Sequence, residues 1–405
     1  MRTQVAIVGA GPAGLLLSHL LGLRGIESVI IENRSRAYVE ARQRAGVLEQ
    51  GTVDTLLESG VGERLKQEGL RHDGIYLQWP GERHRINFAE LCGRSVWVYG
   101  QTEMVKDLIE ARLAAGQQLQ FEVSGVTLED LDGDRPVARY IDSGGGRRHL
   151  DADIVVGADG FHGVSRPSIP APRRRTWERD YPFAWLGILA TVPPSTDELI
   201  YVWHPRGFAL HSMRSPSVSR LYLQVDPGEK IENWPDERIW AELAQRMQLE
   251  GWSLREGPVT DKSITPMRSF VSTPMRYGRL FLVGDAAHIV PPTGAKGLNL
   301  AVSDVRLLAA ALGEYFAGSG AGPGSGSAAG REYWLNRYPD DALAQVWRKT
   351  HFSWWMTTML HIPGGPVPGA DFEQQLQLAQ LRYVTSSVAA ATELAENYTG
   401  LPLRI

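Results

Sequence analysis

Gly9-Ala10-Gly11-Pro12-Ala13-Gly14 decides the fold, because an apolar, β-branched segment precedes it at Gln4–Val8 and a helical pattern follows it at Leu15–Leu23. A second apolar segment of strand character comes next, at Ser28–Ile31. The order strand, turn, helix and strand predicts a βαβ unit with a parallel sheet. Glycines in such a turn let backbone N–H groups and the positive end of the helix approach a pyrophosphate.

Glu32 ends the second predicted strand, 18 residues after Gly14. A carboxylate at this position can accept hydrogen bonds from a ribose hydroxyl. A lone glycine motif is often only a structural turn, but the strand context and the acidic residue together favour a dinucleotide site, formed by Gly9, Gly11, Gly14 and Glu32. These residues do not separate FAD from NAD, because both carry a pyrophosphate and an adenosine ribose.

Two further acidic residues follow predicted buried strands. Asp159 comes after Asp153–Gly157, and Asp285 comes after Arg279–Val283. At the end of a strand a carboxylate can meet a sugar hydroxyl or an incoming nucleotide, although either residue alone would usually belong to a turn.

The rest of the chain divides into a predicted antiparallel sheet and a helical C-terminal part. Strand patterns recur at Ile75–Trp79, Ser95–Tyr99, Glu198–Trp203, Gly207–His211 and Arg220–Val225. Helical periodicity returns at Gly297–Leu312 and from Glu332 onward, with a break at Ile362–Gly369, and the Gly- and Ser-rich segment 317–330 is predicted to be a flexible surface loop. We expect a cofactor domain over 1–175 that contributes residues near 72–100 to the substrate sheet, a substrate sheet domain over 176–278, and a return to the first domain with a helical interface region over 279–405.

Composition favours small-molecule chemistry in the cytoplasm. The 405 residues carry a formal net charge of -4 with both signs interspersed, which attracts neither nucleic acid nor anionic lipid. No apolar run approaches the roughly 20 residues that span a bilayer, no secretory signal precedes Val8, and the single Cys92 cannot form an intrachain disulfide. No metal site is expected. Twelve tryptophans fit a packed core or a subunit interface.

Five longer motifs identify a resemblance that runs nearly end to end: Ala45–Gly51, Tyr99–Thr102, His204–Ala209, Gly284–Leu300 and Glu396–Tyr398. With the acidic residues above, they resemble the flavoprotein aromatic hydroxylase family, in particular its members that act on 4-hydroxybenzoate. The resemblance selects FAD as the cofactor. It implies an α/β fold with a Rossmann-like FAD-binding domain, an inserted antiparallel-sheet substrate domain, a helical C-terminal part and a homodimer.

The implied reaction uses NADH or NADPH to reduce FAD, and O2 to form a flavin C4a-hydroperoxide that hydroxylates 4-hydroxybenzoate ortho to its phenol, giving 3,4-dihydroxybenzoate. Only one dinucleotide motif is present, so the nicotinamide cofactor is expected to bind transiently. Asn33, where relatives that prefer NADPH often carry Arg, favours NADH, whereas Arg34 and Arg36 could hold a 2'-phosphate. The alternatives are the same chemistry on a related acid such as 4-aminobenzoate, a flavin-free NAD-dependent dehydrogenase, and an inactive FAD-binding protein.

The resemblance also assigns a proton relay and a carboxylate clamp. A Tyr hydroxyl both donates and accepts, so Tyr201, Tyr398 and His72 can carry the phenolic proton to solvent. Without the resemblance, each would more often be a packed aromatic or a surface histidine. Arg offers a planar two-pronged donor to a carboxylate, and although most arginines form surface ion pairs, the clamp is expected to comprise Ser212, Arg214 and Tyr222. The backbone carbonyl of Pro292 is expected near the phenol oxygen.

The flavin contacts come from the same resemblance. Arg44 and Gln101 are assigned to the phosphate and ribityl region, and Asn299 with the Leu298 backbone to the isoalloxazine edge. Arg220 and Lys296 would supply positive charge that favours the anionic reduced flavin, although Lys296 could equally be a solvated loop lysine. The complete expected cofactor set is Gly9, Gly11, Gly14, Glu32, Arg42, Arg44, Ala45, Gly46, Val47, Gln101, Asp159, Arg220, Asp285, Lys296, Leu298 and Asn299.

Overall fold

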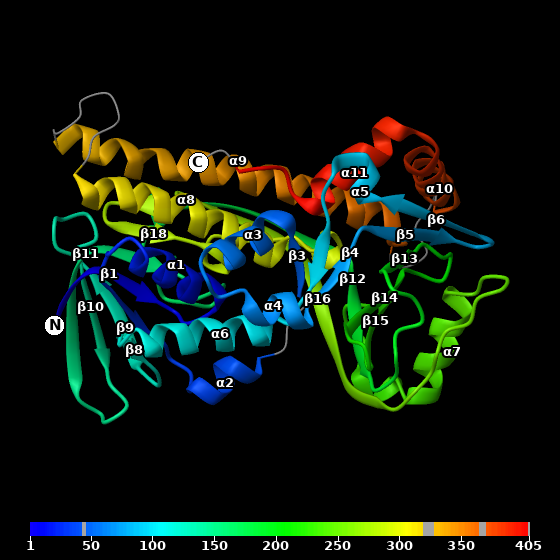
Figure 1. Ribbon diagram of the computed structural model, residues 1–405, viewed down its shortest axis with the longest axis horizontal. Coiled ribbons are helices and arrows are strands. Elements are labelled where there is room, and N and C mark those ends of the chain that lie inside the picture. Colours follow the sequence, from blue (N-terminus) through cyan, green and yellow to red (C-terminus); the bar gives the residue numbers. More distant parts are fainter. Residues whose placement is uncertain (43–45, 319–327, 364–369, 404–405) are drawn as a thin grey trace.

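A computed structural model describes residues 1–42, 46–318, 328–363 and 370–403. Its first eight-stranded sheet lies at one end of the molecule and its second at the other, and the long helix α9 (Ala328–Leu360) extends along both (Figure 1). Within the described residues, the expected α/β fold is confirmed.

The first sheet is the expected parallel sheet. Its strand order is β17-β18-β11-β1-β2-β8, and neighbours from β18 to β8 in this order pair in parallel. Strands β9 and β10 continue from β11 as an antiparallel extension. Strand β1 is buried on both faces through Val5–Val8, as a covered parallel strand should be. The strands are β1 (Arg2–Val8), β2 (Ser28–Ile31), β8 (Leu119–Gln120), β9 (Ser124–Glu129), β10 (Val137–Ile141), β11 (Arg147–Gly157), β17 (Arg276–Tyr277) and β18 (Leu280–Leu282).

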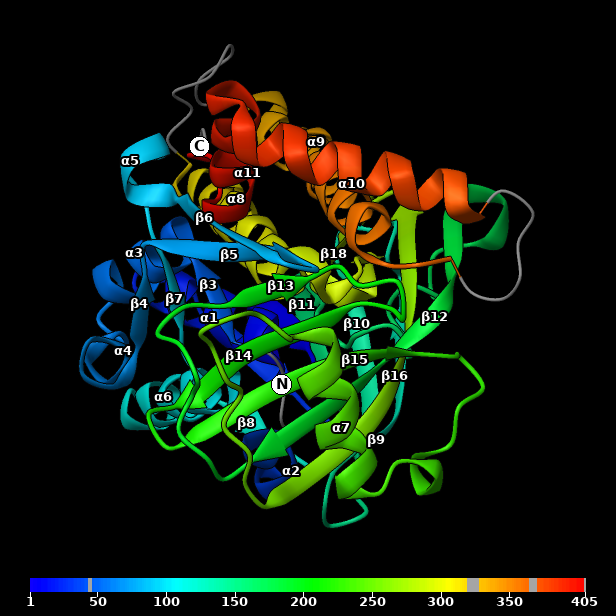
Figure 2. The same cartoon turned by 90° about the vertical axis from the view of Figure 1, so that its right-hand side faces the viewer.

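The second sheet has the order β19-β16-β12-β15-β14-β13-β5-β6 and is antiparallel except for the β13–β5 pair. Alternate residues of its strands face two separate cores, one towards α7 and one towards α9, α10 and α11, which gather beside β5 and β6 (Figure 2). The strands are β5 (Gly74–Trp79), β6 (Glu82–Asn87), β12 (Arg175–Ala190), β13 (Ile200–Val202), β14 (Ala209–Ser215), β15 (Val218–Val225), β16 (Val259–Thr273) and β19 (His288–Ile289).

A third, three-stranded sheet comprises β3 (Val47–Glu49), β7 (Val96–Val98) and β4 (Leu70–His72). Helix α1 packs against α6 and α8 beside the first sheet. The remaining helices are α1 (Pro12–Gly22), α2 (Arg36–Ala41), α3 (Gln50–Glu58), α4 (Glu63–Glu68), α5 (Phe88–Cys92), α6 (Gln101–Ala114), α7 (Asp236–Arg246), α8 (Gly297–Ala317), α10 (Ala370–Ser386) and α11 (Val388–Thr399).

Three expectations need correction. The strand predicted at Ser95–Tyr99 exists as β7, but it pairs with β3 and β4 and does not join the substrate sheet. The long strands β12 and β16 were not predicted, because their exposed halves carry many polar residues. The loop predicted at 317–330 is too long: Ala317 ends α8 and α9 begins at Ala328, in keeping with the high helix propensity of alanine. The rest of that loop, and most of the predicted break at Ile362–Gly369, lie outside the described residues.

Candidate active site

The glycine turn leaves room for a ligand at one position only. Gly9 has φ +106°, and a Cβ there would lie 2.5 Å from the carbonyl oxygen of Ala158. A Cβ at Gly14 would lie 2.1 Å from the carbonyl oxygen of Gly9, so both glycines are required by the protein itself. A Cβ at Gly11 would meet no atom within 4 Å. Gly11 is the N-cap of α1 and provides no side-chain cap, so the first N–H groups of this helix receive no hydrogen bond from that position.

Acidic residues lie around this turn. The carboxylate of Glu32 accepts hydrogen bonds from the backbone N–H of Ala10 (2.7 Å) and of Arg34 (2.8 Å), which hold it at the end of β2. Asp159 follows β11 and accepts two hydrogen bonds from Ser165, while its Oδ1 is buried without a partner among the described residues. Burial raises the pKa of Asp159. Asp285 follows β18 in a short 3-10 turn.

A cavity lies on the face of the second sheet that is turned towards the C-terminal helices. Tyr201 on β13 and Tyr222 on β15 are both cross-strand partners of Leu210 on β14, so the three side chains share one face of the sheet. The cavity brings together the expected substrate residues and three of the expected flavin residues. Its lining comprises Gly46, Val47, Val98, Trp185, Leu199, Tyr201, Leu210, Ser212, Met213, Arg214, Arg220, Tyr222, Pro292 and Ala295.

Arg214 lies at a register shift between β14 and β15, and it and its neighbour Met213 both line the cavity. Its guanidinium donates to Thr102 Oγ1 at 2.6 Å and occupies space that a side chain at Gly100 would fill. Burial lowers the pKa of Arg214, and the nearby Arg220 lowers it further. Arg220 Nη1 is buried without a partner among the residues described, so two cations face a site that favours an anion.

Tyr201 and Tyr398 form a direct hydrogen bond between their hydroxyls, 2.6 Å apart, and both side chains are buried. Tyr398 comes from α11, which closes over the sheet. Burial raises the pKa of both phenols, so both stay protonated at neutral pH.

His72 is buried at the end of β4, and neither ring nitrogen has a hydrogen-bond partner in the described part of the chain. Burial lowers its pKa to about 4, against the opposing effect of nearby acids, so the ring is neutral at pH 7. The structure therefore forms the first link of the expected relay directly, but gives no direct hydrogen bond to His72.

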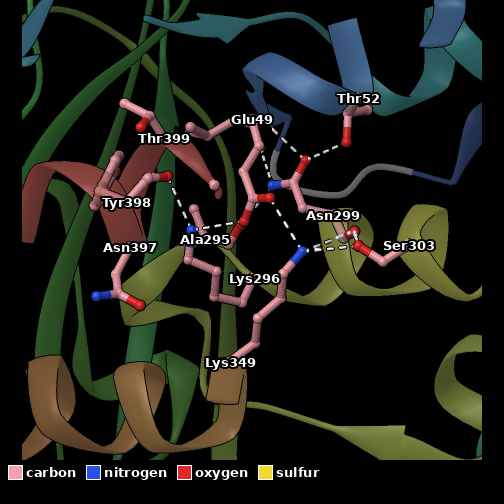
Figure 3. Close-up of polar contacts among 12 residues, drawn as sticks. Glu49, Thr52, Ala295, Lys296, Asn299, Ser303, Lys349, Asn397, Tyr398 and Thr399 are labelled. Carbon is pink, nitrogen blue, oxygen red and sulfur yellow. Dashed lines mark hydrogen bonds and ion pairs between the residues drawn. The ribbon is translucent and has the colours of Figure 1, made fainter. Parts of the chain in front are cut away.

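The expected cation immediately precedes α8, and the expected amide lies in its first turn. Lys296 is completely buried and donates to Glu49 Oε1 at 2.7 Å and to the carbonyl oxygen of Tyr398 at 2.9 Å (Figure 3), so it is not a solvated loop lysine. The Asn299 amide makes four hydrogen bonds within the protein, to Glu49 N–H, the Thr52 hydroxyl and the carbonyls of Val47 and Ala295. Its hydrogen-bonding capacity is filled, so Asn299 fixes β3 against α8.

Comparison with known proteins decides the family. A family model described as an FAD binding domain matches residues 2–327. The chain is 47% identical, over 100% of its own length and 97% of the relative's, to the p-hydroxybenzoate hydroxylase of Acinetobacter baylyi. This chain belongs to the FAD-dependent aromatic hydroxylases.

More distant members of the hydroxylase family agree. The 3-amino-4-hydroxybenzoate 2-monooxygenase of Streptomyces cremeus is 27% identical, over 93% of this chain and 92% of that relative. The crystal structure of p-nitrophenol 4-monooxygenase from Pseudomonas putida superimposes with a TM-score of 0.80 at 19% identity, covering 98% of this chain and 99% of that one, which supports the fold. The protein is thus a flavin monooxygenase with FAD as its cofactor, and NAD(P)H and O2 are the typical co-substrates of such enzymes.

The residues present fit the FAD of this hydroxylase family. Gly11 leaves space at the α1 N-terminus. The buried atoms Asp159 Oδ1 and Arg220 Nη1 have no hydrogen-bond partner within the described residues. Of the other expected contacts, Gln101 begins α6, Leu298 lies in the first turn of α8, and Arg42 is exposed just after α2. Arg44 and Ala45 lie outside the described residues.

Sequence reasoning missed three residues that the geometry brings to the site. Thr102 holds Arg214, and Glu49 pairs with Lys296; both lie inside motifs already quoted, where no separate signal marked them. Lys349 contacts the same carboxylate from 300 residues away, and no local pattern could have found it.

Within the described residues, no helix is long and apolar enough to cross a membrane, and no cluster of potential metal ligands occurs.

Proposed function

We propose that this hydroxylase converts 4-hydroxybenzoate to 3,4-dihydroxybenzoate, with NAD(P)H as reductant and O2 as the source of the added oxygen. The observation that carries the proposal is the cavity, which is lined by the half-buried Arg214 and by Tyr201, whose hydroxyl is hydrogen-bonded to that of Tyr398. An acid with a phenol matches both features. The printed name of the 47% identical relative points to the same substrate.

The cationic side of the cavity would bind the carboxylate. Arg220 is one cause of the lowered pKa of Arg214, and a bound anion would relieve the repulsion between the two guanidinium groups. Ser212 donates its hydroxyl to the carbonyl of Arg220 and lines the same cavity, as does Tyr222. The fork of Arg214 fixes the orientation of a planar carboxylate as well as its position.

The tyrosine pair would remove the phenolic proton. The Tyr201 hydroxyl can accept the substrate's proton while it donates its own to Tyr398 Oη, 2.6 Å away, so neither phenol needs to ionise. Losing that proton makes the ring carbon beside the oxygen electron-rich. Tyr398 must then release its own proton, and His72, whose two ring nitrogens are buried without partners among the described residues, would be the acceptor, reached through water. The Pro292 carbonyl would accept from the phenol before the proton leaves.

Bound, reduced FAD would supply the electrons that activate O2, and O2 would supply the transferred oxygen atom. The chain's own contribution is to bind FAD at the α1 turn, to hold Lys296 and the start of α8 beside Pro292, and to exclude water with α11. Exclusion of water strengthens each of these electrostatic contacts.

The test is oxidation of NADH and of NADPH by the purified protein, with and without 4-hydroxybenzoate, while 3,4-dihydroxybenzoate is followed by chromatography. We expect stimulated oxidation with equal amounts of product, and a faster rate with NADH. 4-Aminobenzoate is the comparison substrate. If FAD is bound but 4-hydroxybenzoate yields no product while 4-aminobenzoate does, the substrate assignment is wrong and the reaction type stands.

A further inference from the structure

A buried carboxylate lies between two lysines behind the cavity (Figure 3). Glu49 on β3 accepts from Lys296 Nζ at 2.7 Å through one oxygen and from Lys349 Nζ at 3.0 Å through the other. All three side chains are buried. Burial raises the pKa of Glu49, but the two lysines outweigh it and hold that pKa below its usual value, so the carboxylate is ionised.

Three hydrogen bonds hold the ammonium group of Lys349 in place. Besides Glu49, it donates to the Ser303 hydroxyl at 2.9 Å and to the Asn299 carbonyl at 3.2 Å, both on α8. It comes from α9, whereas Lys296 immediately precedes α8. Such a desolvated ammonium with three oxygen partners differs from the exposed lysines that make most surface ion pairs.

The charges of this cluster do not cancel. Two ammonium groups share one carboxylate, so one positive charge remains in a region of low dielectric. Without Lys349, Glu49 would pair with Lys296 alone, and the local charge would be zero. Arg348 is half-buried on the same helix. The charge of Glu49 acts on the pKa of Arg348, but the hydrogen bond of this guanidinium goes to another residue.

We propose that Lys349 is a positioning residue: by occupying the second oxygen of Glu49, it leaves Lys296 with an uncancelled positive charge that stabilises the reduced, anionic form of bound FAD. The inference rests on the proposed function and on the place near the flavin that the family resemblance implies for Lys296. The residue acts through Glu49 and does not touch the flavin.

The experiment is the redox equilibrium of bound FAD against a reference dye, without oxygen or aromatic substrate, in variants of the holoenzyme. In Lys349→Met the ratio of reduced to oxidised flavin at a fixed dye potential should fall on the order of tenfold, because one nearby unit charge is lost. Glu49→Gln combined with Lys349→Met removes one charge of each sign and should return the ratio to within about twofold of the wild type. Lys66→Met, which breaks an exposed ion pair with Glu63, is the matched control and should change nothing.

Two further variants keep the comparison decisive. Lys349→Arg preserves the charge, and the adjoining cavity of about 170 Å³, which both Glu49 and Lys349 line, gives the larger guanidinium room; this variant should keep the wild-type ratio. Should Lys349→Met fail to fold, Lys349→Gln, which is neutral but still donates, makes the same comparison. A Lys349→Met ratio equal to that of the wild type overturns the proposal, as does a double variant that lies further from the wild type than the single one.

The outcome is separable from that of the proposed function. The redox measurement needs only bound FAD, so failure to hydroxylate 4-hydroxybenzoate leaves it valid. Normal hydroxylation combined with an unchanged redox ratio in Lys349→Met overturns the role of Lys349 alone.

Discussion

At the scale of single residues, loss of the Tyr201 hydroxyl is the most direct test of how the phenolic proton leaves the cavity. Tyr201→Phe removes the hydrogen bond to Tyr398 and with it the exit for the phenolic proton. We expect less hydroxylated product per NAD(P)H oxidised at neutral pH, with partial recovery as the pH rises and the substrate ionises without help. Product and NAD(P)H are measured together across the pH range.

The matched control is Tyr140→Phe, which removes a hydroxyl bonded to Gln120 far from the cavity. It should leave the ratio of product to NAD(P)H unchanged at every pH. If Tyr201→Phe stays fully coupled at neutral pH, the tyrosine pair is not the proton exit.

Arg214 provides a second test at this scale. Arg214→Lys keeps the charge but loses the planar fork and the contact with Thr102, so KM for 4-hydroxybenzoate should rise by about 10- to 100-fold, as expected for the loss of charged hydrogen bonds. Arg206→Lys, in an exposed pair with Glu242, is the control, with unchanged KM. A normal KM in Arg214→Lys would place the carboxylate elsewhere.

At the scale of elements, the turn before α1 separates what the fold needs from what the ligand needs. Gly9→Ala should destabilise the protein by about 1–3 kcal/mol, because its φ is positive and its Cβ would meet the Ala158 carbonyl. Gly11→Ala, at φ −70° with open space, should leave apoprotein stability within about 0.5 kcal/mol but weaken FAD binding at least tenfold.

Thermal unfolding of the apoprotein and titration with FAD measure the two effects. Wild-type affinity in Gly11→Ala would contradict a pyrophosphate at this turn, whereas wild-type stability in Gly9→Ala would contradict the steric argument.

The elements that could be predicted from the sequence are those with an uninterrupted run of apolar residues. Strands β1, β2 and β18 are buried on both faces and appeared as continuous apolar runs. Half of β12 is exposed and polar, so no alternation marked it. The expected substrate residues of the cavity came from the family resemblance, but the contacts of Arg214 with Thr102 and of Glu49 with Lys349 join positions 112 and 300 residues apart, which no local pattern encodes.

At the scale of the whole molecule, three buried neutral histidines make stability depend on pH. Burial lowers the pKa of His72 and His211 to about 4 and that of His361 to about 3, whereas an unfolded histidine titrates near 6.5. The unfolded chain therefore binds more protons below pH 6.5. The free energy of unfolding should fall as the pH drops from 6.5 to about 4, by up to about 1.4 kcal/mol per pH unit for each histidine.

Urea unfolding at several pH values measures this slope. His211→Gln should reduce it, and the exposed His84→Gln should not. Stability that stays constant between pH 4.5 and 6.5 would mean that these rings are protonated in the folded protein.

The C-terminal helices present exposed apolar side chains. Phe372, Leu376 and Tyr383 share one face of α10 and are 66%, 49% and 57% exposed, and Val388 at the start of α11 is 75% exposed. We propose that this surface forms the homodimer. Light scattering at micromolar concentration should give a dimer for the wild type and a monomer for Phe372→Glu with Tyr383→Glu; a monomeric wild type would contradict the proposal.

Tyr398 also has a consequence for how the protein is made. Its hydroxyl is hydrogen-bonded to that of Tyr201 and its carbonyl accepts from Lys296, yet the ribosome adds it 197 residues after Tyr201. A nascent chain can therefore bury its glycine turn and complete its sheets before it possesses a proton exit. A chain whose translation stops before α11 would lack the closing helix and with it the hydroxyl that receives the proton from Tyr201.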